Sequence, residues 1–178
     1  MKHKLTLIFL LLATISYSQE KIEWLTWDEA VKRSETDSVP KKIFIDLYTD
    51  WCGWCKRMDQ VTFANPEVAA YMNQHFYNVK FDAEQKDSIV YEGNVFKNSN
   101  PTAKKREGVH LLAYSLMDGE LSYPTYVVLD ENRARITYIK GFKTVPDFMA
   151  TITFFATNQH VQYMQYLEKQ YQKRQTQK

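Results

Sequence analysis

The chain has few cysteines, almost no net charge and no long apolar segment beyond its N-terminus. Each of these absences excludes a class of protein. Its 178 residues include two cysteines, so a framework of several disulfides cannot hold the fold together. Beyond residue 18 no segment is apolar enough to span a bilayer. The 23 basic and 21 acidic residues leave a small net charge, which does not favour nucleic-acid binding.

The first 18 residues have the pattern of a secretory signal peptide. Residues 1–4 form a basic start, residues 5–15 are apolar, and Ser16 and Ser18 place small side chains at positions −3 and −1 of a cleavage point ahead of Gln19. The apolar stretch is about half of the roughly 20 residues that a membrane span needs. We therefore predict export to a periplasmic or secreted location without stable membrane insertion; the alternative is a permanent N-terminal anchor. Removal of Lys2 and Lys4 with this segment leaves 21 basic and 21 acidic residues.

The two cysteines lie three positions apart in Trp51-Cys52-Gly53-Trp54-Cys55, directly after an apolar run at residues 43–48. The run predicts a buried strand, and we expect a helix to begin at Cys52. Unpaired backbone N–H groups and the positive end of the helix dipole would favour a thiolate there. Cys52 would then attack a disulfide, and Cys55 would resolve the mixed disulfide. This motif predicts a two-electron redox site.

One carboxylate, Asp46, interrupts the apolar strand before the cysteines. Burial of an unpaired charge is costly, so we expect its pKa to be raised. The alternative is an aspartate turned to a strand edge and bonded to backbone. Trp51 is expected to shield one side of the site and to offer a flat surface to a partner, whereas Lys56 is either a small aid to the thiolate or an ordinary exposed residue.

The surrounding pattern alternates helices and strands. Residues 26–29 form a capping-box sequence that predicts a helix through about Ser34, before a strand at about 42–48. Asn65-Pro66-Glu67 predicts the start of a helix over 66–75, which leads into a strand over 76–82. A strand, helix and strand of this length predict a parallel pair, with Cys52 at the carboxyl edge of the sheet.

Residues 83–122 predict an insert with structure of its own. Apolar residues on both sides of Glu92-Gly93-Asn94 indicate a small hairpin, and the spacing from Val109 to Met117 is that of one helix face. The insert either contributes to partner choice or covers an edge of the sheet. Its basic run, residues 104–106, is interpreted as a solvated loop rather than a phosphate-contacting patch.

The last part of the chain predicts a second hairpin and two helices. Residues 124–130 and 134–140 form the hairpin, and a helix follows from Thr144. Residues 160–177 predict an amphipathic helix with a fraying end. We expect this tail to pack against the domain rather than to mediate dimerisation. The predicted organisation is a signal peptide at 1–18, a domain at 19–157 and a tail at 158–178.

These motifs resemble the thioredoxin superfamily. The resemblance is carried by Asp46, Cys52-Gly53-Trp54-Cys55 and Tyr123-Pro124-Thr125, and it covers roughly residues 40–157. Residues 63–68 make it closest to secreted thioredoxin-like proteins of the thiol:disulfide interchange type. It implies an α/β thioredoxin-like fold, with a mixed central sheet flanked by helices on both faces and an insert before the cis-proline strand.

The resemblance also implies roles for single residues. Asp46 would lie beneath Cys55 and accept its proton, directly or through a water. Pro124 would be a cis-proline with Tyr123 touching the substrate; a trans proline at the start of a strand is the alternative. Gly53 and Trp54 complete the surface around the cysteines, and Trp54 stands where thioredoxin itself has proline. Lys80 belongs to this neighbourhood only if its register matches, so it is not among the predicted site residues.

We therefore predict a thiol:disulfide oxidoreductase that acts on disulfides of client proteins, in the direction of reduction. It would need no cofactor, no metal and no nucleic acid, and it would take electrons from a membrane-embedded donor. One alternative is copper or zinc binding by the cysteine pair, where zinc would need further ligands from His75, His110 or His160. A second alternative is a non-catalytic interaction module.

Overall fold

The computed structural model describes residues 20–102 and 104–176; the predicted signal peptide lies outside these ranges. The central sheet is mixed and has five strands in the order β1-β3-β2-β6-β7. β2 pairs in parallel with β3 and antiparallel with β6. The strands are β1 Trp24–Leu25, β2 Lys42–Tyr48, β3 Phe76–Asp82, β6 Thr125–Leu129 and β7 Arg135–Lys140. No helix of the described ranges combines the length and the apolar character needed to cross a membrane.

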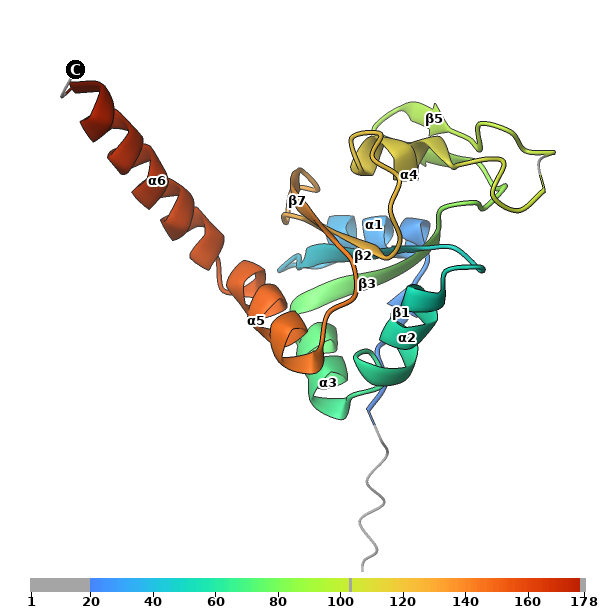
Figure 1. Ribbon diagram of the computed structural model, residues 1–178, viewed down its shortest axis with the longest axis horizontal. Helices are drawn as coiled ribbons and strands as arrows, with labels where there is room; N and C mark the ends of the chain where they lie inside the picture. Colours follow the sequence, from blue (N-terminus) through green and yellow to red (C-terminus); the bar gives the residue numbers. More distant parts are fainter. Residues whose placement is uncertain (1–19, 103, 177–178) are drawn as a thin grey trace, which may run out of the picture.

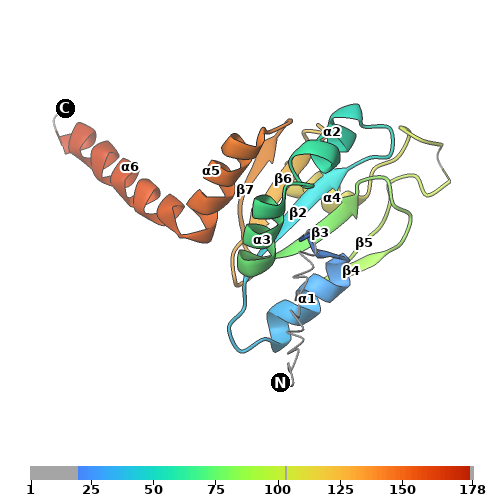
Figure 2. The same ribbon diagram turned by 90° about the horizontal axis from the view of Figure 1, so that it is seen from below.

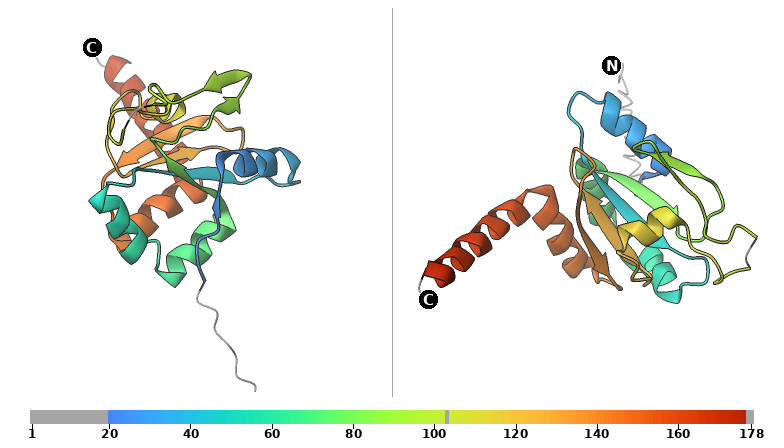
Figure 3. Two further views of the ribbon diagram at one scale, coloured as in Figure 1. Left: turned by 90° about the vertical axis from the view of Figure 1, so that its right-hand side faces the viewer. Right: turned by 90° about the horizontal axis from the view of Figure 1, so that it is seen from above.

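Helices cover both faces of the sheet, as predicted (Figure 1, Figure 3). Successive residues of β2 point to opposite faces, so Ile43 and Ile45 pack in the core beneath α1 and α4, whereas Phe44 packs in the core beneath α2, α3 and α5. The helices are α1 Trp27–Thr36, α2 Gly53–Val61, α3 Pro66–His75, α4 Leu111–Leu116 and α5 Val145–Ala156.

Local signals set several element ends. The Thr26 hydroxyl accepts a hydrogen bond from the Glu29 N–H, and the Glu29 carboxylate accepts one from the Thr26 N–H, which completes the predicted capping box. Asn65 caps α3. The bounds of β2, α3 and β3 are those predicted, whereas α1 runs two residues beyond Ser34.

The insert forms the predicted hairpin and helix. The hairpin strands β4 (Ile89–Tyr91) and β5 (Asn94–Phe96) pair with each other outside the main sheet. α4 begins after His110, whose Nδ1 accepts a hydrogen bond from the Leu112 N–H, so Val109 lies outside the helix. Leu112 packs in the same core as α1. The insert therefore covers one face of the sheet.

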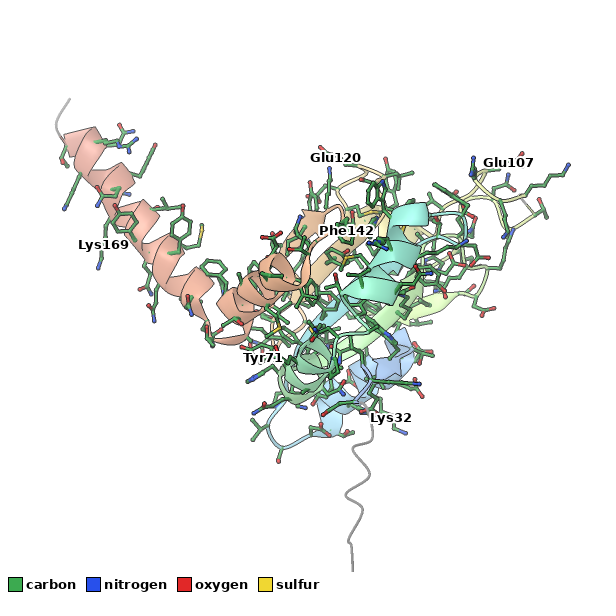
Figure 4. All side chains as sticks on the ribbon, turned by 60° about the horizontal axis from the view of Figure 1, so that its bottom comes forward. Lys32, Tyr71, Glu107, Glu120, Phe142 and Lys169 are labelled. Atoms are coloured by element: carbon green, nitrogen blue, oxygen red, sulfur yellow. A yellow bond between two sulfur atoms is a disulfide. The ribbon has the colours of Figure 1, made fainter. Side chains whose placement is uncertain are left out.

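The last helix, α6 (Gln159–Thr176), forms, but the prediction that it packs against the domain is wrong. None of its residues is buried, and it extends away from the sheet (Figure 1, Figure 2). The side chains around Lys169 point outward from the helix without neighbours from the domain (Figure 4). Asn158, with a φ of 59°, breaks the helix after α5 and turns the chain away. An apolar period predicts a helix without specifying what covers it.

Candidate active site

A disulfide joins Cys52 and Cys55 at the start of α2. Cys52 is the N-cap residue, and its Sγ accepts a hydrogen bond from the Cys55 N–H at 3.0 Å. The same N–H and the helix dipole can stabilise a negative charge on this sulfur when the disulfide is reduced. Both cysteines are buried, at 5% exposed for Cys52 and 2% for Cys55, and Cys52 lies at the helix N-cap while Cys55 lies within the first turn.

A chain of charged side chains lies beneath α2. Asp46 on β2 is 1% exposed, and its Oδ2 accepts a hydrogen bond from Lys80 Nζ at 2.6 Å. Lys80 lies opposite Asp46 in the parallel register of β2 and β3, and its Nζ also contacts Asp59 of α2. Since Asp59 is one helical turn after Cys55, these contacts place Asp46 beneath the helix that carries the disulfide.

The environment of Asp46 moves the pKa of its carboxyl group toward neutrality. Burial raises the pKa of Asp46 to about 6, and the positive charge of Lys80 opposes part of that rise. Its Oδ1 is buried without a hydrogen-bond partner among the described residues. For Lys80, burial lowers the pKa, but the two aspartates outweigh it and the net direction is upward. The carboxyl group can therefore change charge while Lys80 stays protonated.

Aromatic rings surround the Lys80 ammonium. It lies 5.0 Å from the ring centre of Trp24, 5.1 Å from that of Tyr48 and 5.4 Å from that of Phe63. Lys80 and Asp59 also line a cavity of about 500 Å³. Asp46 does not line this cavity, so only the Lys80 and Asp59 end of the charged chain borders it.

The Tyr123–Pro124 peptide bond is cis, as the resemblance implies. Pro124 leads directly into β6, which pairs with the strand that carries Asp46. The Tyr123 ring meets the Trp51 ring edge to face, with centroids 5.9 Å apart. Burial raises the pKa of Tyr123 to about 12, with Glu84 adding to the rise, so its phenol is neutral. Trp51 and Tyr123 together form one aromatic wall of the site.

The other predicted surface residues lie around the helix start. Trp51 is 36% exposed and Trp54 is 63% exposed. Trp54 packs against Phe142, with ring centroids 5.7 Å apart; Phe142 is labelled in Figure 4. A side chain at Gly53 would meet no atom within 4 Å, so the backbone between the cysteines is open.

Four residues of this region were not among the predicted site residues: Lys80, Asp59, Glu84 and Arg106. Lys80 is a lone cation in an apolar strand, and Asp59 lies one turn after Cys55; both are signals present in the sequence. Glu84 accepts hydrogen bonds from the Trp51 Nε1 and from the Arg106 backbone N–H, both at 2.9 Å. No local pattern marks that contact, because the path of the insert creates it.

His110 lies in the insert and was one of the predicted further zinc ligands, but both of its ring nitrogens have other partners. His110 is fully buried, its Nδ1 caps α4, and its Nε2 lies 3.0 Å from the Asp87 carbonyl oxygen. Burial lowers the pKa of His110. Over residues 20–102 and 104–176, no group of three His, Cys, Asp or Glu side chains is placed to hold a metal ion. His110, with both ring nitrogens engaged, is therefore not free to serve as a further zinc ligand.

Solved structures share this fold. One described as DsbH Oxidoreductase matches with a TM-score of 0.52 at 18% identity, covering 82% of this chain and 91% of that chain. A putative disulphide-isomerase from Bacteroides thetaiotaomicron also gives a TM-score of 0.52, at 27% identity, covering 76% of this chain and 93% of that chain. These similarities confirm the thioredoxin-like α/β fold.

Sequence comparison leads to the same group of proteins. The thiol:disulfide interchange protein DsbD of Haemophilus ducreyi is 28% identical over 135 residues, which cover 75% of this chain and 19% of that protein. The chain spans only 9% to 19% of the length of the first curated relatives that it matches. The model of the family Thioredox_DsbH, described as "Protein of unknown function, DUF255", matches residues 11–177. The chain therefore belongs to this thioredoxin-like DsbH family.

Proposed function

We propose that this protein is an exported thiol:disulfide oxidoreductase that reduces disulfides of client proteins. The observation that carries the proposal is the Cys52–Cys55 disulfide at the first turn of α2. The Cys52 sulfur accepts a hydrogen bond from the Cys55 N–H. The similarity to proteins named for thiol:disulfide interchange supports it. Cys52 is the nucleophile and Cys55 is the resolving thiol.

The reaction moves two electrons from the protein dithiol to the client. The Cys52 thiolate attacks one client sulfur, a Cys52–client disulfide forms, and the second client sulfur leaves as a thiolate. Cys55 then gives its proton to the Asp46 carboxylate, and its thiolate attacks the Cys52 sulfur. The Cys52–Cys55 bond forms as the bond to the client breaks. The client thiolates take up the proton held by Asp46 and one proton from solvent.

Lys80 and Asp59 are positioning residues for that proton transfer. Lys80 holds Asp46 Oδ2 and leaves the buried Oδ1 without a partner, so one carboxylate oxygen is available to a proton. Its positive charge keeps the Asp46 pKa from rising further. The cavity beside Lys80 and Asp59 supplies solvent from which the proton balance is restored. A pKa of about 6 suits a group that accepts and releases a proton near neutral pH.

The client is proposed to lie across the surface formed by Trp51, Gly53, Trp54, Tyr123 and Pro124. The backbone before the cis-proline is available to pair with an extended client segment. The open backbone at Gly53 lets the client approach the Cys52 sulfur. The two tryptophans that flank Cys52 in the sequence, Trp51 and Trp54, present exposed apolar area to the client.

The direction and the location belong to the same proposal. A buried carboxylate beneath the cysteines, and Gly53 after Cys52, resemble thioredoxin, and we therefore assign the protein as a reductase. A reductase outside the cytoplasm must be re-reduced, and a membrane-embedded dithiol donor is the proposed source of electrons. Residues 1–18 are proposed as the signal peptide, 19–157 as the domain with its insert, and 158–178 as the tail.

Insulin-disulfide reduction tests the proposal, and wild type but not Cys52→Ser is expected to be active. Titration of the Cys52–Cys55 pair against glutathione, followed by tryptophan fluorescence with Cys55→Ser as the control, gives the direction. A potential near about −250 mV or below supports a reductase, whereas one near about −130 mV indicates an oxidant. Absence of any reversible transition would overturn the oxidoreductase assignment.

A further inference from the structure

A cavity of about 450 Å³ opens beside the disulfide, between the cysteine loop and the insert. Trp51 and Tyr123 line it on the side of the reactive site, Arg106 and Val109 on the side of the insert, and Leu121 before the cis-proline strand. Trp51 directly precedes Cys52, and Tyr123 directly precedes Pro124. A segment of client bound along Tyr123 therefore passes the mouth of this cavity.

Arg106 is held at that mouth by a ring contact and a backbone hydrogen bond, and no described residue forms an ion pair with it. Its guanidinium carbon lies 4.7 Å from the ring centre of Trp51, and its backbone N–H donates to Glu84. Glu84 Oε1 also accepts a hydrogen bond from the Trp51 indole N–H. One carboxylate oxygen therefore holds both the backbone at Arg106 and the Trp51 ring. No carboxylate of the described residues forms an ion pair with the Arg106 guanidinium, whereas the neighbouring Lys105 pairs with Asp50 at 3.2 Å.

The other charged residues that line the cavity are two carboxylates, Glu84 and Glu107, each of which accepts N–H groups of the loops that it holds. Glu84 accepts two N–H groups, and Glu107 Oε2 accepts the Lys104 N–H at 3.2 Å; Glu107 is labelled at the tip of this loop in Figure 4. Arg106 is left with a planar group of five N–H donors, which matches a carboxylate. Stacking on Trp51 orients this group before a partner arrives, so little freedom is lost on binding.

We infer that Arg106 is a specificity residue for client proteins with an acidic residue beside the reactive disulfide cysteine. This inference rests on the proposed function, because the client must present its disulfide to Cys52. The client carboxylate pairs with the Arg106 guanidinium, and the adjoining client side chain lies against Val109 and Leu121. The insert thereby selects clients, while the thioredoxin-like core carries out the exchange.

Three short peptides test the inference. Each peptide contains a single cysteine, and two copies are joined by a disulfide into a symmetric dimer. The cysteine is flanked on both sides by Asp in the first peptide, by Ala in the second and by Lys in the third. The rate of peptide reduction by the pre-reduced protein is followed by tryptophan fluorescence at low ionic strength. Wild type is expected to reduce the Asp peptide roughly two- to fivefold faster than the Lys peptide, the range for an exposed ion pair, after normalisation to each peptide's rate with dithiothreitol. Added salt should reduce the difference.

Variants separate Arg106 from its neighbours. Arg106→Ala is expected to remove the preference and Arg106→Glu to reverse it, while Lys105→Ala retains it. All variants should reduce neutral hydroxyethyl disulfide at the wild-type rate. Equal normalised rates for the three peptides in wild type, or a preference that survives Arg106→Glu, would overturn the inference alone. If wild type reduced neither the peptides nor hydroxyethyl disulfide, the proposed function would fail and this inference with it.

Discussion

The disulfide has a buried side and an exposed side, and different parts of the chain build them. Beneath α2, Asp46 is 1% exposed and the Lys80 side chain 21%, and both are held by adjacent strands. Beside the cysteines, Trp51 is 36% exposed and Trp54 is 63% exposed. A charge on the buried side acts strongly on a nearby proton, whereas water and salt screen a charge on the exposed side. The chemical step and the choice of client can therefore be altered separately.

The largest effect is expected at the disulfide itself. Cys55→Ser leaves Cys52 able to attack but removes the thiol that resolves the adduct, so turnover falls to background and a Cys52–client disulfide accumulates. Non-reducing electrophoresis and mass spectrometry of the adduct provide the measurement. Cys52→Ser is the control and should trap no client. A client trapped on Cys55 instead would reverse the assignment of the two sulfurs.

The buried carboxylate should give the next largest effect on rate. Asp46→Asn removes the acceptor of the Cys55 proton, so the resolution of a preformed mixed disulfide should slow by roughly 100-fold at pH 7. Stopped-flow fluorescence of that single step measures the change. Asp50→Asn, an exposed aspartate in the loop before Trp51, is the matched control and should resolve at the wild-type rate. Equal rates for Asp46→Asn and wild type would remove Asp46 from the proton transfer.

The same substitution should stabilise the fold. Because burial raises the pKa of Asp46 to about 6, the neutral form favours folding; that contribution is complete below about pH 4 and is lost as pH rises through 6. Asparagine has no such loss. The stability advantage of Asp46→Asn should therefore grow by about 2 to 3 kcal/mol between pH 4 and pH 8. Urea unfolding of the oxidised proteins measures it, and a constant difference would contradict the raised pKa.

A smaller shift is expected from Lys80. Its charge lowers the Asp46 pKa, so Lys80→Met should raise that pKa further. Resolution needs ionised Asp46, and its rate falls as the pH drops through the Asp46 pKa. The acidic limb of the profile should move to higher pH by roughly one unit or more. Lys56→Met, at an exposed position of α2, is the matched control and should leave the acidic limb in place. If Lys56→Met shifted the limb as far as Lys80→Met does, the effect would come from the general loss of positive charge.

The smallest effect is expected far from both sides of the site, on α6. Leu167 is 40% exposed, so Leu167→Ala should change the free energy of unfolding by no more than about 0.5 kcal/mol. Phe148 on the preceding helix α5 is 1% exposed, and Phe148→Ala should cost about 3 to 5 kcal/mol. Denaturant unfolding compares the two variants. A large loss for Leu167→Ala would show that α6 is covered in solution.

Elements with strong local signals were predicted most completely. Asn65 and Pro66 mark the start of α3 through a side-chain cap and a preset φ, and large apolar residues recur along the strand that follows, at Phe76, Val79 and Phe81. β1 was missed because two residues, Trp24 and Leu25, are too short to show a period. Its pairing with β3 depends on the fold around it.

The site divides in the same way. The reactive cysteines and Asp46 stand out because of their spacing and because a carboxylate in an apolar run is costly. Lys80 was not among the predicted site residues because its contact with Asp46, 34 positions earlier, depends on the register between β2 and β3. Arg106 was interpreted as part of a solvated loop; it is exposed, yet it stacks on Trp51.

Residue type and spacing were enough to predict a dithiol at a helix start, a carboxylate in the apolar strand before it, and a proline ahead of a second strand. Those features depend on residue type and on local backbone preference, which short stretches of sequence specify. Three features depend on tertiary structure: Lys80 contacts Asp46, Arg106 stacks on Trp51, and α6 contacts α5 near its start, at His160 and Tyr163. Each of these depends on how distant segments come together, and contacts between distant segments are set by the packing of the whole fold.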